Sequence, residues 1–149
     1  MQLESTRFGS IHCGADDYVI FPDGLIGFED LRLWTLLIDH RLAWLQSLEN
    51  GEIALPVTNP FPFVPDYKIR LAPEDCKNLA IGSEHRPLVL VVVNHIEKQW
   101  TINLHAPILV CPTRRLGRQI VTLDEQPLRH ALPRTAVLLR TAVLPRKSA

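Results

Sequence analysis

LVLVVVNHIEKQWTINLHAPILV, residues 88–110, carries the strongest strand pattern in the chain. Its first six residues are all aliphatic, so a strand there would bury both of its faces. Strands over residues 88–96 and 99–110 would form a hairpin around the two-residue turn Glu97-Lys98. We therefore expect this hairpin to lie at the centre of the fold.

The same turn predicts the register of the hairpin. A two-residue connection places His95 opposite Trp100 and His105 opposite Leu90. The two histidines are then about five residue pairs apart, or roughly 17 Å, so they cannot share a metal ion.

Short apolar runs, each closed by Pro, Gly, Asn or Asp, continue on both sides of the hairpin and are typical of strands. Alternation of Tyr67, Ile69 and Leu71 with Lys68 and Arg70 predicts a further, half-exposed strand. The other expected strands are residues 7–13, 17–21, 31–39, 53–58 and 119–123. Residues 42–48 form a further apolar element whose type the pattern does not decide. The sequence thus predicts an all-β fold, a small antiparallel barrel-like domain of about eight short strands.

One short helix is expected over residues 73–80, because Pro73 suits the first helical position and Glu74 and Asp75 favour its N-terminal dipole. The domain is expected to span residues 1–132. Residues 133–149 form a basic C-terminal tail in which Arg-Thr-Ala-Val-Leu occurs twice, and we expect it to be flexible.

The composition describes one ordinary soluble domain of 149 residues, with 46% hydrophobic and 21% charged residues and no net charge. The charges are unevenly placed. Residues 1–60 carry nine acids and three bases, and residues 114–149 carry eight bases and two acids. This asymmetry either marks an acidic surface for a basic partner or is neutralised within the fold. No signal peptide or membrane span is recognisable, so a cytoplasmic protein is expected.

Motifs for catalysis or cofactor binding are missing from the sequence. It contains no GxSxG, HExxH, GxxxxGK[ST] or GxGxxG, and its three cysteines fit neither a disulfide framework nor a zinc site. We therefore expect no enzyme activity, no metal and no cofactor. Binding of RNA or an oligosaccharide by a small β-barrel stays an alternative, although the aromatic residues and the basic residues lie in different parts of the chain.

The stretch FPDGLIGFED, residues 21–30, is the most distinctive candidate for binding. Gly24 and Gly27 flank Leu25 and Ile26, so a glycine-hinged loop carries apolar side chains beside the acids that close it. This loop is either an apolar docking surface with an acidic rim or a loop whose Leu25 and Phe28 fill the core.

These residues resemble the flagellar assembly factor FliW family, and the resemblance runs through most of residues 6–130. Seven motifs match in order. They are Phe8-Gly9, FPDGLIGFE (21–29), WLQSLE (44–49), LPV with Pro60 (55–60), PDY (65–67), TINLHAP (101–107) and GRQ (117–119). Leu55 and Gln126 stand where the family usually has Phe and Tyr.

The resemblance implies a small, all-β, cytoplasmic binding protein without enzyme activity. Its partners would be flagellin and the CsrA-type translational repressor, which compete for it, with no direct contact to nucleic acid or membrane. The residues expected to bind partners are Phe21, Gly24, Leu25, Gly27, Phe28, Glu29, Asp30, Leu45, Glu49, Glu52 and Pro107. Those expected to hold the structure are Gln46, Ser47, Asn103 and Ala106.

Overall fold

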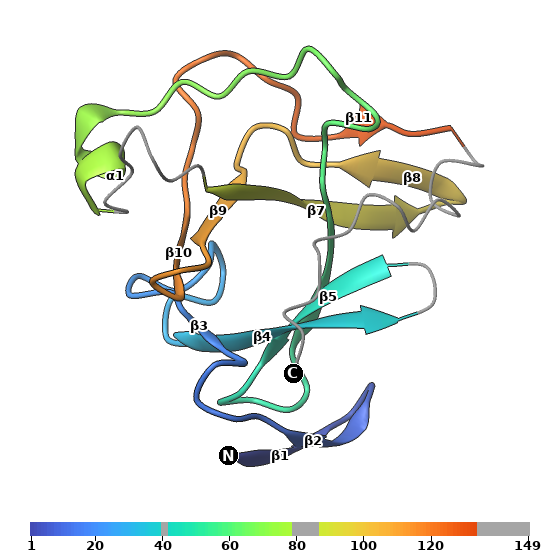
Figure 1. The fold of residues 1–149 in the computed structure, drawn as a ribbon. Coiled ribbons are helices and arrows are strands. Elements are labelled where there is room, and N and C mark those ends of the chain that lie inside the picture. Colours follow the sequence, from blue (N-terminus) through green and yellow to red (C-terminus); the bar gives the residue numbers. More distant parts are fainter. Residues whose placement is uncertain (40–41, 79–86, 134–149) are drawn as a thin grey trace.

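Eleven strands and one helix are found in the described residues, 1–39, 42–78 and 87–133, of the computed structural model (Figure 1). The strands are β1 (Gln2–Ser5), β2 (Gly9–His12), β3 (Val19–Ile20), β4 (Leu33–Asp39), β5 (Leu42–Ser47), β6 (Ala54–Thr58), β7 (Leu88–Ile96), β8 (Gln99–Ile102), β9 (Ile108–Cys111), β10 (Leu116–Gln119) and β11 (His130–Ala131). The helix is α1 (Pro73–Asn78).

Seven strands close into a barrel in the order β7-β6-β5-β4-β3-β10-β9, because β9 also pairs with β7. All of these pairings are antiparallel except β3 with β10, where Ile20 lies opposite Leu116. The barrel core consists of Phe21, Leu25, Trp34, Ala43, Leu45, Val57, Leu90, Ile108 and Val110. The predicted all-β, barrel-like fold is confirmed.

Strand β7 is covered on both faces, which explains its aliphatic run. Leu90 packs inside the barrel, whereas Val91 and Val93 belong to a second cluster with Tyr67 and Leu104. A strand buried on both sides must carry apolar residues at consecutive positions. The hairpin is therefore central, as predicted.

The hairpin register is confirmed near the turn and wrong beyond it. His95 lies opposite Trp100, and their rings stack with centroids 4.1 Å apart. Leu90, however, lies opposite Ile108 and not His105. The cause is that the expected strand over residues 99–110 divides into β8 and β9 around a loop at residues 103–107, so β9 pairs in a shifted register.

Strands β1 and β2 form a separate hairpin, at the end of the molecule away from β8 and β11 (Figure 1). The connection between them packs on the outer face of β5. The Arg7 guanidinium lies 4.0 Å from the centroid of the Trp44 ring, and Phe8 meets that ring edge-on. Strand β1 was not predicted, because the segment QLES has no apolar run.

The segment at residues 67–71 is not a strand, although it was predicted as one. Its side chains nevertheless alternate between more buried and exposed positions. Tyr67 is buried, Ile69 and Leu71 are half-buried, and Lys68 and Arg70 are exposed. The apolar positions cover the outside of the barrel, and the segment pairs irregularly with residues 122–126.

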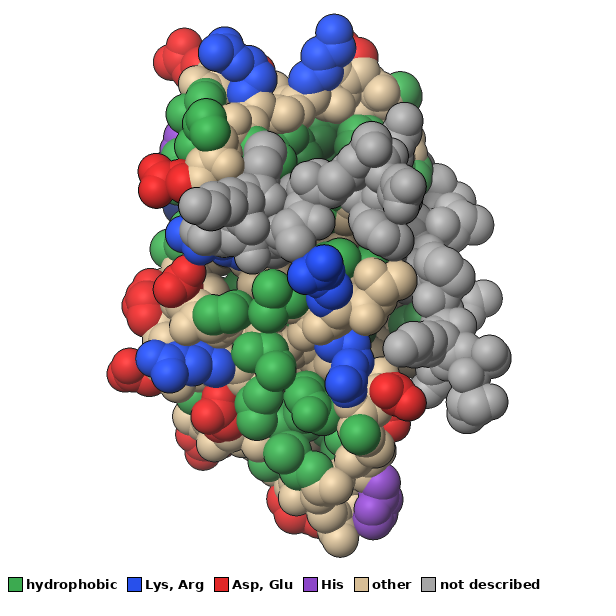
Figure 2. Space-filling model, turned by 60° about the vertical axis from the view of Figure 1, so that its left-hand side comes forward, with side chains coloured by type: hydrophobic (Ala, Val, Ile, Leu, Met, Phe, Trp, Pro, Cys, Tyr) green, Lys and Arg blue, Asp and Glu red, His purple; other side chains and the backbone are tan. Residues whose placement is uncertain are grey.

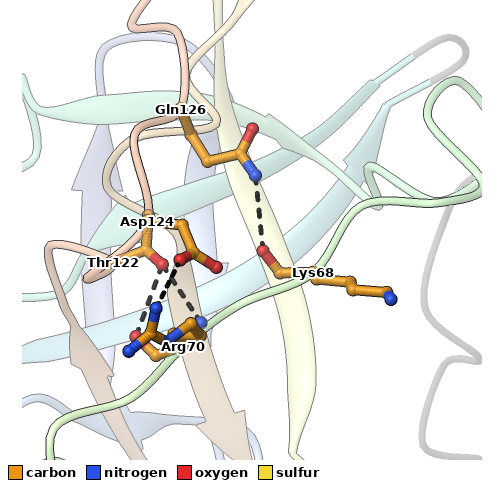
Figure 3. A network of polar contacts seen from close by, with 5 residues as sticks. All are labelled: Lys68, Arg70, Thr122, Asp124 and Gln126. Carbon is orange, nitrogen blue, oxygen red and sulfur yellow. Dashed lines mark hydrogen bonds and ion pairs between the residues drawn. The ribbon is translucent and has the colours of Figure 1, made fainter.

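Figure 3 shows five of the residues that make these irregular contacts. The backbone N–H of Arg70 donates to Thr122 Oγ1 at 3.1 Å, and the Arg70 guanidinium pairs with Asp124 at 3.0 Å. Gln126 Nε2 donates to the carbonyl of Lys68 at 3.5 Å. The expected strand at residues 119–123 is displaced accordingly, because β10 ends at Gln119 and the chain then runs beside residues 67–71.

Helix α1 begins at Pro73, as predicted, and its described part ends at Asn78. The predicted continuation to residue 80 and the predicted basic tail with its repeat lie outside the described residues, apart from Pro133. No helix in the described ranges is long and apolar enough to cross a membrane.

Candidate partner-binding surface

Residues 25–28 form a tight turn in the loop between β3 and β4. The N–H of Phe28 donates to the carbonyl of Leu25 at 2.7 Å, and Leu25 N–H donates back at 3.4 Å. Gly27 has φ of +89°, the value that the third position of a type II turn requires and that glycine adopts at little cost. A Cβ at Gly27 would meet open space, so the backbone conformation alone selects glycine there.

Gly24 is constrained by close packing as well as by its φ of +67°. A Cβ at this position would lie 2.5 Å from the carbonyl oxygen of Phe28 and 2.6 Å from Cα of Glu29. The start of the loop therefore lies directly against its end, and no other residue can replace Gly24 without moving the backbone.

Four of the five apolar side chains expected to contact partners are buried. Phe21 and Leu25 lie in the barrel core with 0% and 1% exposure, and Leu45 and Pro107 are also buried. Phe28 is half-buried against Trp34. Of the two roles left open for the loop, Leu25 therefore takes the second and fills the core. Phe21, Leu25, Leu45 and Pro107 do not form an exposed docking surface, because all four are buried.

The exposed apolar side chain of the loop is Ile26, which is 55% exposed at the tip of the turn. Sequence reasoning missed it. Ile26 projects outward because Leu25 and Phe28 pair across the turn, a pairing that is seen only in the structure.

The turn is tied to the rest of the barrel by Gln119 at the end of β10. Gln119 Oε1 accepts a hydrogen bond from Ile26 N–H at 2.8 Å, and its Nε2 donates to the carbonyl of Ala106 at 3.0 Å. Asn103 Oδ1 in turn accepts from the N–H groups of Ala106 and His105, at 3.1 and 3.0 Å. The two loops at residues 25–28 and 103–107 are thus held as one unit.

The four acids predicted to rim this surface are exposed, and two of them also brace the backbone. Glu29 accepts from Gly27 N–H at 2.8 Å. Glu49, just after β5, accepts from the N–H groups of Arg32 and Leu33, the latter at 2.8 Å. These contacts place Glu49 beside the chain that follows the turn. Asp30 and Glu52 are the other two acids of the set.

The surface of the molecule shows how such charges are distributed. Figure 2 shows acidic side chains along one side of the view and hydrophobic side chains grouped between charged ones. Some of the acids are neutralised by arginines. Arg118 on β10 pairs with Asp23 at 3.1 Å and with Asp75 at 3.3 Å, which joins the loop to α1.

Gln46 and Ser47 hold the turn after β5. Gln46 is fully buried, accepts from Ser5 Oγ at 2.7 Å and donates to the carbonyls of Ser47 and Ile53 at 2.9 and 3.1 Å. Ser47 Oγ accepts from the N–H groups of Glu49 and Asn50, at 3.1 and 3.0 Å. These are structural contacts of the kind expected for both residues.

Tyr67, from the PDY motif, is buried beneath the loop at residues 103–107. Its hydroxyl donates to the carbonyl of Leu104 at 2.6 Å. Burial raises the pKa of Tyr67 from 10.0 to about 12, because the charged phenolate loses hydration there.

Within residues 1–39, 42–78 and 87–133, no group of three or more His, Cys, Asp or Glu is placed to hold a metal ion. Cys13 and Cys111 are buried and free. The arrangement is therefore a braced loop with one exposed apolar side chain and nearby carboxylates, which suits contact with another protein.

Comparisons with known proteins find the same family along almost the whole described chain. Residues 2–132 match the family model described as FliW protein. The flagellar assembly factor FliW of Clostridium tetani is 37% identical over 131 residues, covering 85% of this chain and 90% of that protein. The one from Thermoanaerobacter pseudethanolicus is 34% identical over 140 residues, covering 89% and 93%.

A solved structure is similar too. The crystal structure of the flagellar assembly factor FliW superposes with a TM-score of 0.81 at 26% identity, covering 89% of this chain and 98% of that one.

Proposed function

Because this chain belongs to the FliW family of flagellar assembly factors, we propose that it works by switching between two protein partners. It binds flagellin, and it binds a CsrA-type translational repressor and so relieves repression of flagellin translation. While flagellin is abundant it occupies the factor, and once flagellin is exported the freed factor captures the repressor. The protein acts in the cytoplasm as a binding protein, without catalysis or cofactor.

The observation that carries this proposal is the family match over residues 2–132, and the exposed carboxylates beside the turn support it. A repressor that silences messenger RNA carries basic surface, since phosphate contacts dominate affinity for RNA. Glu29, Asp30, Glu49 and Glu52 offer complementary charge to that surface and repel phosphate. Negative charge thus favours the repressor and disfavours its RNA.

The alternative, an RNA- or oligosaccharide-binding barrel, needs aromatic faces on which bases or sugars stack. Of the ten aromatic residues, only Phe61 is exposed, at 38%. The alternative therefore receives less support than protein binding.

Calorimetric titration with the organism's own repressor and flagellin, separately and in competition, tests the proposal. Saturable binding to both, with one displacing the other, is the expected result. The repressor complex should also weaken as salt is raised, because exposed charges are screened within about 10 Å at 0.1 M salt. Failure to bind either partner would overturn the proposal, and binding to flagellin alone would reduce the protein to an export chaperone.

A further inference from the structure

We infer that Ile26 is the apolar anchor of the surface that binds the repressor, and that flagellin does not use this anchor, although the two partners exclude each other. The inference rests on the proposed function, since it assigns one of the two partners to one place on the barrel. It differs from the expectation drawn from the sequence, which relied on Leu25 and Phe28.

Ile26 is exposed on a backbone that hydrogen bonds hold in place. Its side chain is 55% exposed, although its own N–H is bound by Gln119 at 2.8 Å and the next N–H, of Gly27, is bound by Glu29 at 2.8 Å. Leu25, its neighbour, is anchored in the core. An apolar group presented by a fixed backbone loses little conformational freedom on binding, which is the property of an interface anchor.

The charge around Ile26 is mainly negative. Glu29 and Asp30 are exposed within four residues of it, whereas Asp23 is already paired with Arg118. Arg32 is the exposed base on the same segment. With Glu49 held against the N–H groups of residues 32 and 33, the acids outnumber the bases around the turn.

The charge decides between the two partners. An apolar anchor with an acidic rim fits a partner that presents an apolar pocket beside Lys and Arg side chains. An RNA-binding repressor must carry such basic surface, whereas nothing in binding flagellin requires it. The occupant is therefore the repressor.

The test is titration of Ile26→Ala and Ile26→Lys with the repressor and, separately, with flagellin. We expect Ile26→Ala to weaken repressor binding about tenfold, because truncation of an interface anchor typically has effects of this order. Ile26→Lys should weaken it further, since it also places a cation against basic surface. Flagellin binding should change less than about twofold in both variants, and thermal unfolding should be unchanged.

Ile96→Ala is the matched control. Ile96 is 53% exposed, but it lies at the β7–β8 hairpin and away from the turn (Figure 1). It should leave the binding of both partners unchanged. Asp30→Asn should reduce the salt dependence of repressor binding with Ile26 intact.

The outcomes separate this inference from the proposed function. If the wild-type protein binds neither partner, the proposed function fails and the inference fails with it. If the wild type binds both and Ile26→Lys still binds the repressor normally, only the inference is overturned. If the Ile26 variants lose flagellin and keep the repressor, the anchor serves the other partner and the assignment made here is wrong.

Discussion

Gly117→Ala should destabilise the protein through a single steric conflict in the barrel core. A Cβ at Gly117 would lie 2.4 Å from Cε2 and 2.6 Å from Cζ of the Phe21 ring. Phe21 has 0% exposure and packs among the core residues, so its ring has no open space into which to rotate. Overpacking of this kind costs about 1–3 kcal/mol.

At this chain length each kcal/mol lowers the melting temperature by about 2–4 °C, so a fall of roughly 2–12 °C is expected. Thermal and urea unfolding followed by circular dichroism measure it. Gly14→Ala is the matched control, because a Cβ there meets only a carboxylate oxygen of the exposed Asp17, at 3.2 Å. The control should melt within about 1 °C of the wild type.

A double-mutant cycle with Phe21→Leu tests the cause. The shorter side chain removes the ring atoms that the new methyl group strikes, so the cost of Gly117→Ala should shrink by about 1 kcal/mol or more in the Phe21→Leu background. If the cost is the same in both backgrounds, the ring contact is not its origin. If Gly117→Ala melts like the wild type, the packing argument itself is refuted.

Three further predictions concern other parts of the barrel. Burial holds the folded pKa of Tyr67 at about 12, above its unfolded value of 10.0, so the free energy of unfolding should fall as pH rises from 10 towards 12, because the unfolded chain releases the phenolic proton first; urea unfolding at pH 8 to 11.5 should show a shallower decline for Tyr67→Phe. Lys98 has φ of +65°, so Lys98→Gly should raise the free energy of unfolding by about 0.5–1 kcal/mol. Lys98→Ala retains the strain and should not raise it. Gln46→Ala should cost about 1–3 kcal/mol for each buried partner left without a hydrogen bond, Ser5 Oγ among them, and an unchanged denaturation midpoint would contradict this.

The elements that the sequence predicted well are those in which a local pattern has one structural meaning. The aliphatic run of β7 could only be a strand covered on both faces, and Glu97-Lys98 could only be a two-residue turn, so the register near it followed. The division of β8 from β9 was missed, although its cause is local. It depends on Asn103 binding the N–H groups of residues 105 and 106, in a stretch whose side chains still look like a strand.

The candidate surface shows the same limit. The glycines and acids of residues 21–30 predicted the loop and its charge, and the four acids are exposed. Which apolar side chain faces outward depended on contacts with distant residues: Phe21 is enclosed by β10, and Ile26 is oriented by Gln119, which is 93 residues away in sequence. Composition alone could not separate Leu25 from Ile26, although they are neighbours.

The pairing of β3 with β10 also has a consequence for how the protein is made. Strands β4 to β6 contact their sequence neighbours and can assemble as soon as they leave the ribosome, whereas the barrel closes only when residues 116–119 reach β3. Gln119, which fixes the turn, belongs to that last step. A nascent or cleaved chain without β10 therefore contains every residue of the turn but lacks the Gln119 contact that orients Ile26, so the exposed position of Ile26 is fixed only in the completed barrel.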